Sequence, residues 1–332
     1  MLIVYHVPAD AASGNSGLPL GGDVWYNSAM KIVVTGATGM LGRAVMGRFA
    51  AETGFETVGL CHSRTGEGLV QADLADIAAV GPLMDRLAPD VIVHTAAIRK
   101  PDEFAANESA ARRLNVDATA ALARWTAAHP GAFILYMSSD YAFDGTNPPY
   151  VPESPTHPIN GYGVSKVEGE VVVREATADR AAILRVPILW GDVETLDESS
   201  VTSVVEAVLA MRGGEGTRVF DDWAIRYPTH VADVADVLAQ IAARRLAGTW
   251  HWSGTEPLTK FDMATVTAGL AGVDPARLVR SGAPANGSEP RPKDCHLDRS
   301  ALERLGVTAT GRLFEPTVRG LLEKFKCLVL SA

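Results

Sequence analysis

The sequence predicts an α/β protein with a doubly wound parallel sheet, followed by a smaller C-terminal α/β lobe that binds a substrate or a partner. Two observations lead to this prediction. From Lys31 onward, short apolar runs alternate with longer helical stretches, which is the pattern of parallel strands joined by crossover helices. The runs are also rich in Val, Ile and Leu, as expected of strands that are covered on both faces.

The predicted elements follow in order along the chain. We expect strands at 31–35, 56–60, 91–95, 133–137 and 182–186, and helices near 40–52, 76–88, 109–128 and 162–178. After Pro187 the pattern loosens into a helix near 200–212, a strand around 218–220, a helix near 231–245 and the aromatic run TWHWSG. We assign residues 30–187 to the sheet domain, with part of its sheet completed by later residues, and residues 188–332 to the smaller lobe.

The first 29 residues differ from the rest of the chain. The opening MLIVYHV is apolar but has no basic segment, and Pro8 and Asp10 end it too early for a signal peptide. We predict that residues 1–29 form a poorly ordered leader, because they are rich in Gly and Ser and Met30 stands directly before the first strand. A misassigned start codon, an added leader and a genuine extension all fit this pattern.

Composition limits the classes of partner. A net charge of −9 over 332 residues, with no basic block, argues against nucleic-acid binding, because that affinity comes largely from clustered Lys and Arg. No apolar run reaches the roughly 18 residues that span a bilayer, so we expect no membrane partner. Cys61, Cys295 and Cys327 are far apart and odd in number, which is typical of reduced thiols in the cytoplasm. We assign no metal ligands.

A glycine-rich turn follows the first predicted strand. The strand runs into TGATGMLG, which holds the pattern G-x-x-G-x-x-G at the start of a helix. Glycines let the backbone turn sharply and approach a pyrophosphate, and the helix N-terminus presents free N–H groups to that anion. The strand before and the helix after the motif favour this nucleotide-binding interpretation over a tight turn with close helix packing. The residues assigned to the site are Gly36, Thr38, Gly39, Met40, Leu41 and Gly42.

The end of the second strand indicates which dinucleotide binds. A carboxylate there would hold the ribose hydroxyls of NAD, whereas a basic residue would accept the extra phosphate of NADP. The residues are Cys61-His62-Ser63-Arg64, without a carboxylate, and Arg43 adds positive charge just past the glycine turn. This favours NADP(H) as the cofactor of a Rossmann domain. The alternative role for Arg64 is a solvated loop charge.

Further cofactor positions follow the other predicted strands. We expect the adenine at the end of the third apolar segment, and the small residues after the strand at 91–95 would let the cofactor pass over the sheet edge. Arg99 and Lys100 either contact phosphate or face solvent. The residues assigned here are Asp73, Leu74, Thr95, Ala96, Ala97, Arg99, Pro187 and Leu189.

A second set of residues has the composition of a catalytic site. Ser139 follows the strand at 133–137, and Tyr162 and Lys166 have the spacing Y-x-x-x-K near the start of a helix, where they share one face. We expect Lys166 to lower the pKa of Tyr162, which would protonate a carbonyl oxygen while Ser139 hydrogen-bonds it and Lys166 holds the nicotinamide ribose. The alternative is that Tyr162 and Lys166 only bind the cofactor and nothing is turned over.

Several segments taken together identify a family. They are TGATGMLG, SSDYAFDG (138–145), Tyr162-x-x-x-Lys166, RYPTHVADVA (226–235), WHWSG (250–254) and RPKDCHLD (291–298). As a set they resemble the dTDP-4-dehydrorhamnose reductase group of the extended short-chain dehydrogenases/reductases. Within that group, GTNPPY (145–150) and LRVPILWGDVETLDESSVT (184–202) are most similar to the regulatory beta subunits of methionine adenosyltransferase. The resemblance covers about residues 30–310.

The resemblance implies NADP(H) binding and one of two functions. Regulatory beta subunits bind the catalytic methionine adenosyltransferase subunit, which makes S-adenosylmethionine, whereas the reductases act on a nucleotide sugar. The reductases carry an aromatic residue after the sixth strand, where this chain reads Pro187-Ile188-Leu189, with Trp190 available for a shifted contact. We rank the regulatory subunit first, an active NADPH-dependent reductase second and a cofactor sensor third.

The C-terminal tail departs from the resemblance. Regulatory beta subunits are described as docking through this tail, but the ending KFKCLVLSA (324–332) is not similar to theirs. The apolar LVL either anchors a partner or packs on its own lobe, and we favour the second interpretation.

Overall fold

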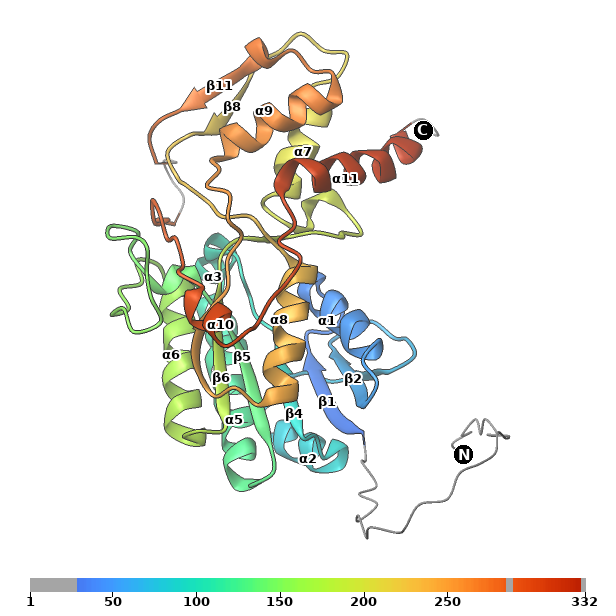
Figure 1. Cartoon of the computed structure of the whole chain (residues 1–332), viewed down its shortest axis with the longest axis vertical. Coiled ribbons are helices and arrows are strands. Elements are labelled where there is room, and N and C mark those ends of the chain that lie inside the picture. The colour runs from blue at the N-terminus through green and yellow to red at the C-terminus, as the bar shows by residue number, and fades with distance from the viewer. Residues whose placement is uncertain (1–28, 285–288, 330–332) are drawn as a thin grey trace, which may run out of the picture.

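A parallel seven-stranded sheet forms the centre of the larger domain, and a smaller lobe stands beyond the carboxyl ends of its strands (Figure 1). The computed structural model describes residues 29–284 and 289–329, and side chains up to residue 325. The predicted leader, apart from residue 29, and the side chains of Cys327 and of the LVL segment lie outside the described residues. The predicted fold class is confirmed.

The strand order is β10-β6-β5-β4-β1-β2-β3, so the chain starts in the middle of the sheet and winds outward in both directions. The strands are β1 Met30–Thr35, β2 Phe55–Cys61, β3 Leu69–Gln71, β4 Val91–His94, β5 Phe133–Ser139, β6 Ala181–Val186 and β10 Gly248–His251. The central register pairs Val33 of β1 with Val58 on one side and Ile92 on the other. All five predicted strands are present, and β3 and β10 are additional.

Helices cover both faces of the sheet. On one face, α1 (Met40–Ala50) and α8 (Val231–Arg244) share an apolar core with β1, β4, β5 and β6. On the other face lie α2 (Ile77–Leu87), α5 (Ala118–Ala128) and α6 (Gly161–Thr177). The connection from β4 to α5 is made of α3 (Pro101–Ala106), α4 (Glu108–Arg112) and the π-helical turn η1 (Arg113–Asp117). The predicted helix at 109–128 is therefore interrupted by a π turn.

The smaller lobe packs three helices around its own apolar core. They are α7 (Thr202–Leu209), α9 (Lys260–Ala271) and α11 (Phe314–Val329), beside a two-stranded parallel sheet of β8 (Arg218–Asp221) and β11 (Leu278–Ser281). Shorter elements are β7 (Leu189–Trp190), β9 (Thr229–His230), α10 (Ser300–Arg304), and the 3₁₀ turns η2 (Asp140–Ala142), η3 (Leu196–Glu198) and η4 (Pro275–Arg277). The sequence analysis predicted neither α9 nor α11.

The chain passes between the two parts several times. After β6 it builds β7, η3, α7 and β8, and then returns to the sheet domain, where α8 packs on α1 and β10 pairs with β6. It next forms α9 and β11 of the lobe, returns for α10, and ends in α11. The stretch from 231 to 251, which the sequence pattern assigned to the smaller lobe, thus completes the sheet domain, because its apolar helix face has the sheet as its partner.

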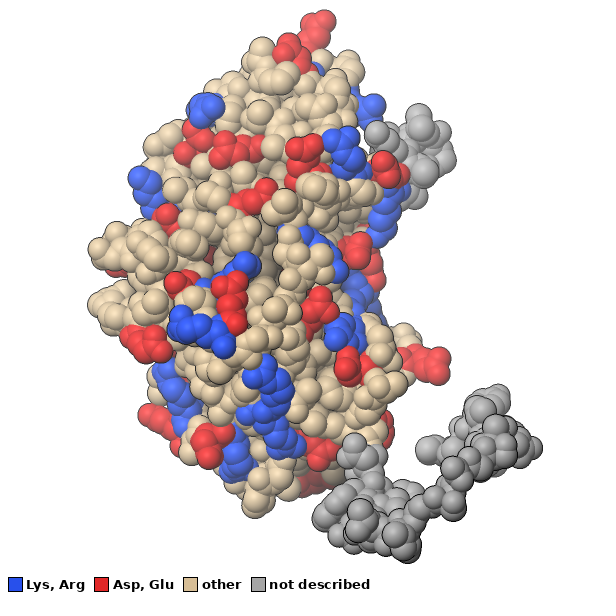
Figure 2. All heavy atoms as spheres, in the orientation of Figure 1, with Lys and Arg blue, Asp and Glu red and all other residues tan. Residues whose placement is uncertain are grey.

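Side chains of both charges occur on the visible surface. Figure 2 shows acidic and basic side chains intermixed on the face in view. Among the helices in the described part of the chain, none has the length and apolarity needed to cross a membrane. Within residues 29–284 and 289–329, no three acidic, histidine or cysteine side chains gather into a metal-binding group.

Candidate cofactor and active site

A cavity of about 1410 Å³ lies between the carboxyl ends of the sheet strands and the smaller lobe. Folds of this class bind nucleotides at that end of the sheet. Arg43 and Arg64 are the two assigned residues that do not line the cavity. Those that do are Gly36, Thr38, Gly39, Met40, Leu41, Gly42, Asp73, Leu74, Thr95, Ala96, Ala97, Arg99, Ser139, Tyr162, Lys166, Pro187 and Leu189.

The glycine turn is packed so closely that two of its glycines have no room for a side chain. Gly36 has a positive φ of 66°, and a Cβ there would lie 2.9 Å from the backbone of Ala96. A Cβ on Gly42 would lie 2.1 Å from the Gly36 carbonyl oxygen. At Gly39, in contrast, the nearest atom would be 3.4 Å away, and α1 begins at Met40 without a side-chain cap. The space at Gly39 and the uncapped helix N-terminus fit a pyrophosphate.

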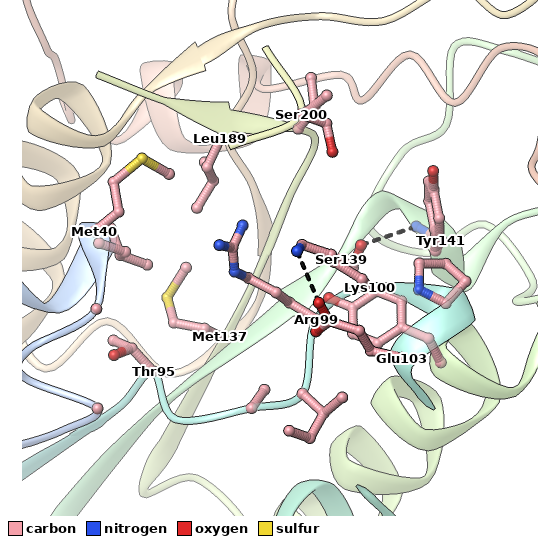
Figure 3. Close-up of a pocket in the computed structure, with 18 of the residues that line it drawn as sticks. Met40, Thr95, Arg99, Lys100, Glu103, Met137, Ser139, Tyr141, Leu189 and Ser200 are labelled. Atoms are coloured by element: carbon pink, nitrogen blue, oxygen red, sulfur yellow. Dashed lines mark hydrogen bonds and ion pairs between the residues drawn. The ribbon is translucent and has the colours of Figure 1, made fainter. Parts of the chain in front are cut away.

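The cavity wall continues along the ends of β2 and β4. Cys61 and His62 line it where β2 ends. The hydroxyl of Thr95 donates a hydrogen bond of 2.7 Å to the carbonyl of Thr35, which fixes the loop after β4 against the end of β1. From this loop the Arg99 side chain reaches into the cavity, as Figure 3 shows.

Ser139, Tyr162 and Lys166 lie on one wall of the cavity, as the sequence predicted. Ser139 is the last residue of β5, and Tyr162 lies in the first turn of α6 with Lys166 one turn later on the same face. The start of α6 is fixed by Asn160, whose side-chain oxygen accepts a 2.8 Å hydrogen bond from the backbone N–H of Gly163. The cap therefore positions the tyrosine at the end of the strand.

Burial is the main cause of the pKa shifts of Tyr162 and Lys166. It raises the pKa of the Tyr162 phenol, although the Ser139 hydroxyl acts in the opposite direction. It also lowers the pKa of the Lys166 ammonium to about 7, with Glu170 opposing that shift. The expected lowering of the Tyr162 pKa by Lys166 is therefore wrong: desolvation dominates, and Lys166 Nζ lies 4.2 Å from the centre of the Tyr136 ring. A tyrosine that keeps its proton at neutral pH still suits a general acid.

A buried carboxyl group beside Ser139 was missed by the sequence analysis. The Ser139 hydroxyl donates a 3.0 Å hydrogen bond to Asp140. It also accepts a hydrogen bond of 3.2 Å from the Tyr141 N–H (Figure 3). Burial raises the pKa of Asp140 to about 6, and the nearby Arg226 opposes that shift. Since Asp140 directly follows Ser139 in the segment SSDYAFDG, its place in the site was open to prediction.

A buried ion pair holds α6 on the sheet behind the cavity. Both oxygens of Glu170 are engaged by Arg185 of β6, with Nε at 2.8 Å and Nη2 at 2.6 Å. The Ser138 hydroxyl of β5 donates a third hydrogen bond to Glu170, at 2.6 Å. The two charged side chains are 0% and 2% exposed, so the position of α6 relative to β5 and β6 depends on these contacts.

Asn115 is a second residue that the sequence analysis missed. It lies in the π-helical turn, where its amide accepts a hydrogen bond from the Ile98 N–H at 2.8 Å and donates one to the Ile98 carbonyl at 3.0 Å. It also donates to the Ser165 hydroxyl at 3.1 Å, and that hydroxyl donates to the Tyr162 carbonyl. Asn115 thus links the loop that carries Arg99 to the helix that carries Tyr162.

The two basic residues assigned to the extra phosphate are held by acidic partners. Arg43 donates two hydrogen bonds to Glu198, at 3.0 and 2.7 Å, and Arg64 donates two to Glu194, at 3.0 and 2.8 Å. Neither arginine is simply a solvated charge, and neither faces the cavity in this arrangement. Trp190 is fully buried against Phe314 and does not line the cavity, so it provides no shifted aromatic contact.

The outer part of the cavity is rich in cations that the sequence analysis missed. These residues come from distant parts of the chain and meet only in the fold, which explains why no local pattern marked them. The cationic residues are Arg218, Arg226, Lys260 and Arg291. Asp102, which also lines the cavity, pairs with Arg291 at 2.5 Å. Such a wall suits a phosphorylated or otherwise anionic ligand.

The sheet, the glycine turn and the Ser139, Tyr162 and Lys166 set have the arrangement of a reductase-like protein with a Rossmann fold. The chain belongs to the family described as RmlD substrate binding domain, whose model matches residues 30–327. The resemblance to the dTDP-4-dehydrorhamnose reductase group is therefore confirmed.

Relatives of two kinds are similar to this chain over most of its length. Methionine adenosyltransferase 2 subunit beta of Mus musculus is 43% identical over 283 residues, which cover 83% of each chain. The subunit of the same name from Danio rerio is 37% identical, covering 92% of this chain and 94% of its own. A dTDP-4-keto-6-deoxy-D-glucose reductase of Streptomyces niveus is 31% identical, covering 83% and 91%.

Solved structures agree on the fold. A dTDP-4-dehydrorhamnose reductase from Clostridium acetobutylicum superposes with a TM-score of 0.76 at 23% identity, covering 90% of this chain and all of its own. The corresponding reductase from Bacillus anthracis, solved in complex with NADP, gives 0.73 at 23% identity, with 89% and 98% covered.

Proposed function

We propose that this chain is an NADP(H)-binding regulatory subunit of a methionine adenosyltransferase and acts in the cytoplasm on S-adenosylmethionine synthesis. The main support for this proposal is a sequence identity of 37 to 43% to proteins named as that enzyme's beta subunit, over most of both chains. The partner would be the catalytic subunit. The buried free thiols of Cys61 and Cys295 support a reducing compartment.

The residues of the cavity fit a bound NADP(H). The backbone of the glycine turn and the N-terminus of α1 would hold the pyrophosphate, and the small residues Thr95, Ala96 and Ala97 leave space along the sheet edge. Arg43 and Arg64 would take the extra phosphate. The nicotinamide, when bound, supplies a hydride donor. Near it, Tyr162 and Lys166 would hold the ribose.

A second candidate function is NADPH-dependent reduction of a nucleotide sugar. Two observations favour it: the cationic outer wall formed with Arg218 and Arg291 suits a diphosphate, and a named sugar reductase is 31% identical. Tyr162 would keep its proton until it transfers it to the carbonyl oxygen, which Ser139 hydrogen-bonds. The site has no aromatic residue where the reductases stack their sugar nucleotide, since Leu189 lines the cavity and Trp190 is buried.

One experiment separates the two functions. The tagged full chain is used to capture partners from native extract with and without NADP, and its oxidation of NADPH is measured with dTDP-4-dehydrorhamnose. Capture of a methionine adenosyltransferase without turnover supports the regulatory function. Turnover that is lost in Tyr162→Phe, with NADPH binding retained and no adenosyltransferase captured, overturns it in favour of the reductase.

A further inference from the structure

The segment from 191 to 200, between β7 and α7, is acidic and is held by arginines of the sheet domain. Glu198 receives two hydrogen bonds from Arg43, and its backbone carbonyl accepts one from Arg99. Glu194 receives two from Arg64, and its own N–H donates to the Glu198 carboxylate at 3.0 Å. We call residues 191–200 the acidic segment.

Arg43 and Arg64 come from the two elements that flank the proposed cofactor cavity at its ribose end. Arg43 lies in the first turn of α1, directly after the glycine turn, and Arg64 follows β2 by three residues. Cys61 and His62, from the same strand end as Arg64, line the cavity. In Rossmann domains the adenosine ribose lies against the end of the second strand, so a group attached to that ribose would meet these guanidinium groups.

The Glu194 carboxylate lies where both guanidinium groups converge. It is 2.8 Å from Arg64 and 3.7 Å from Arg43. Two arginines around one anion form a site that a phosphate monoester would also occupy, because guanidinium binds carboxylate and phosphate with the same paired N–H geometry. The Glu194 and Arg64 side chains are about half exposed, at 47% and 51%, so this pair is open to competition from a ligand.

We propose that Glu194 is a specificity-determining residue whose carboxylate competes with the 2′-phosphate of NADP(H) for Arg64 and Arg43. This inference rests on the proposed binding of NADP(H). The phosphate carries nearly two negative charges and displaces the single charge of Glu194. NAD(H) has no such group and leaves the pair intact. Glu194 therefore weakens the preference for NADP(H) that the two arginines create.

The proposal is tested by measuring the dissociation constants of NADPH and NADH with the full chain, from nicotinamide fluorescence. Glu194→Gln should tighten NADPH binding about two- to fivefold, the range expected for release of one exposed ion pair, and leave NADH unchanged. Asp197→Asn is the matched control. It removes one charge from the same segment, but Asp197 accepts its hydrogen bond from Thr195 and contacts neither arginine, so both constants should stay at their wild-type values.

A double mutant tests whether Glu194 acts through its contact with Arg64. Arg64→Gln should weaken NADPH binding and spare NADH, and adding Glu194→Gln should then improve NADPH binding much less than it does in the wild type. Equal changes for both nucleotides in Glu194→Gln, or weaker NADPH binding, would overturn the role of Glu194 alone. A wild-type chain that binds neither nucleotide would instead overturn the proposed cofactor site.

Discussion

The side-chain amide of Asn115 donates a hydrogen bond to the Ser165 hydroxyl across 3.1 Å, and this contact joins the π-helical turn to the helix that carries Tyr162. The same amide makes both hydrogen bonds with the backbone of Ile98. One residue therefore sets the distance between the loop after β4 and the start of α6.

Asn115→Ala should weaken NADPH binding and lower stability. It removes two hydrogen bonds from the partly buried Ile98 backbone, which together contribute about 1 to 3 kcal/mol. Titration with NADPH and urea unfolding would measure the two effects. Asn147→Ala is the control, because the side chain of the exposed Asn147 donates only to the neighbouring Thr146 hydroxyl. Unchanged affinity in Asn115→Ala would show that the π turn does not position the site.

Gly39→Asp should abolish NADP(H) binding and leave the fold intact. The structure has room for a Cβ at this position, but the carboxylate would stand where the pyrophosphate is expected. Gly269→Asp places the same charge on an open, exposed position of α9 that does not line the cavity, and this variant should bind NADPH normally. Calorimetric titration with NADPH and the melting temperature are measured for both variants. Undiminished affinity in Gly39→Asp would refute the pyrophosphate assignment.

The buried Lys166 should make stability depend on pH. Its pKa is about 7 in the folded protein and 10.5 when unperturbed, so between these values the unfolded chain binds more protons and the free energy of unfolding rises with pH. Lys166→Met lacks this dependence. Its stability relative to wild type should therefore be greater at about pH 6 than at about pH 9, by on the order of a few kcal/mol. Urea unfolding at both pH values tests the sign, and a difference independent of pH would contradict the prediction.

Glu170→Gln should destabilise the protein strongly. The substitution leaves the buried Arg185 with no carboxylate, a change that typically costs about 3 to 5 kcal/mol. Glu315→Gln provides a comparison, since it breaks an exposed pair with Arg319 and should cost less than about 1 kcal/mol. The denaturant midpoints of the two variants and of the wild type measure these losses of stability. Similar losses in the two variants would mean that the buried pair does not hold α6 in place.

Most of the sheet, and the parts of the cavity wall formed by the glycine turn and by Tyr162 and Lys166, could be predicted because these signals are contiguous. The glycine turn and the Tyr162 to Lys166 spacing are each contained in one stretch of chain, and their positions relative to a strand or helix follow from local geometry. The pairing of Arg64 with Glu194 joins residues 130 apart, and no local pattern contains it. The sequence analysis singled out Arg64 for its charge, but its acidic partner could not be predicted.

Other features were missed for different physical reasons. The π turn contains Asn115, whose side chain bonds to Ile98 in the loop after β4, while the sequence there shows only an ordinary helical pattern. The buried residues of helix α9 follow helical spacing, but its other face also carries the apolar Val266 and Leu270, which hides the periodicity in the sequence. The four-residue β10 is recognisable as a strand only through its pairing with β6.

Because the chain passes repeatedly between sheet and lobe, the lobe is not one continuous segment that could be exchanged as a unit. A cut after β6 would remove not only the lobe but also α8 and the edge strand β10, and would leave α1 with an uncovered apolar face. Grafting the lobe of a relative onto this sheet would require several matched splice points at once. Divergence of ligand or partner within this architecture is therefore expected to proceed by substitutions along the cavity wall rather than by exchange of whole domains.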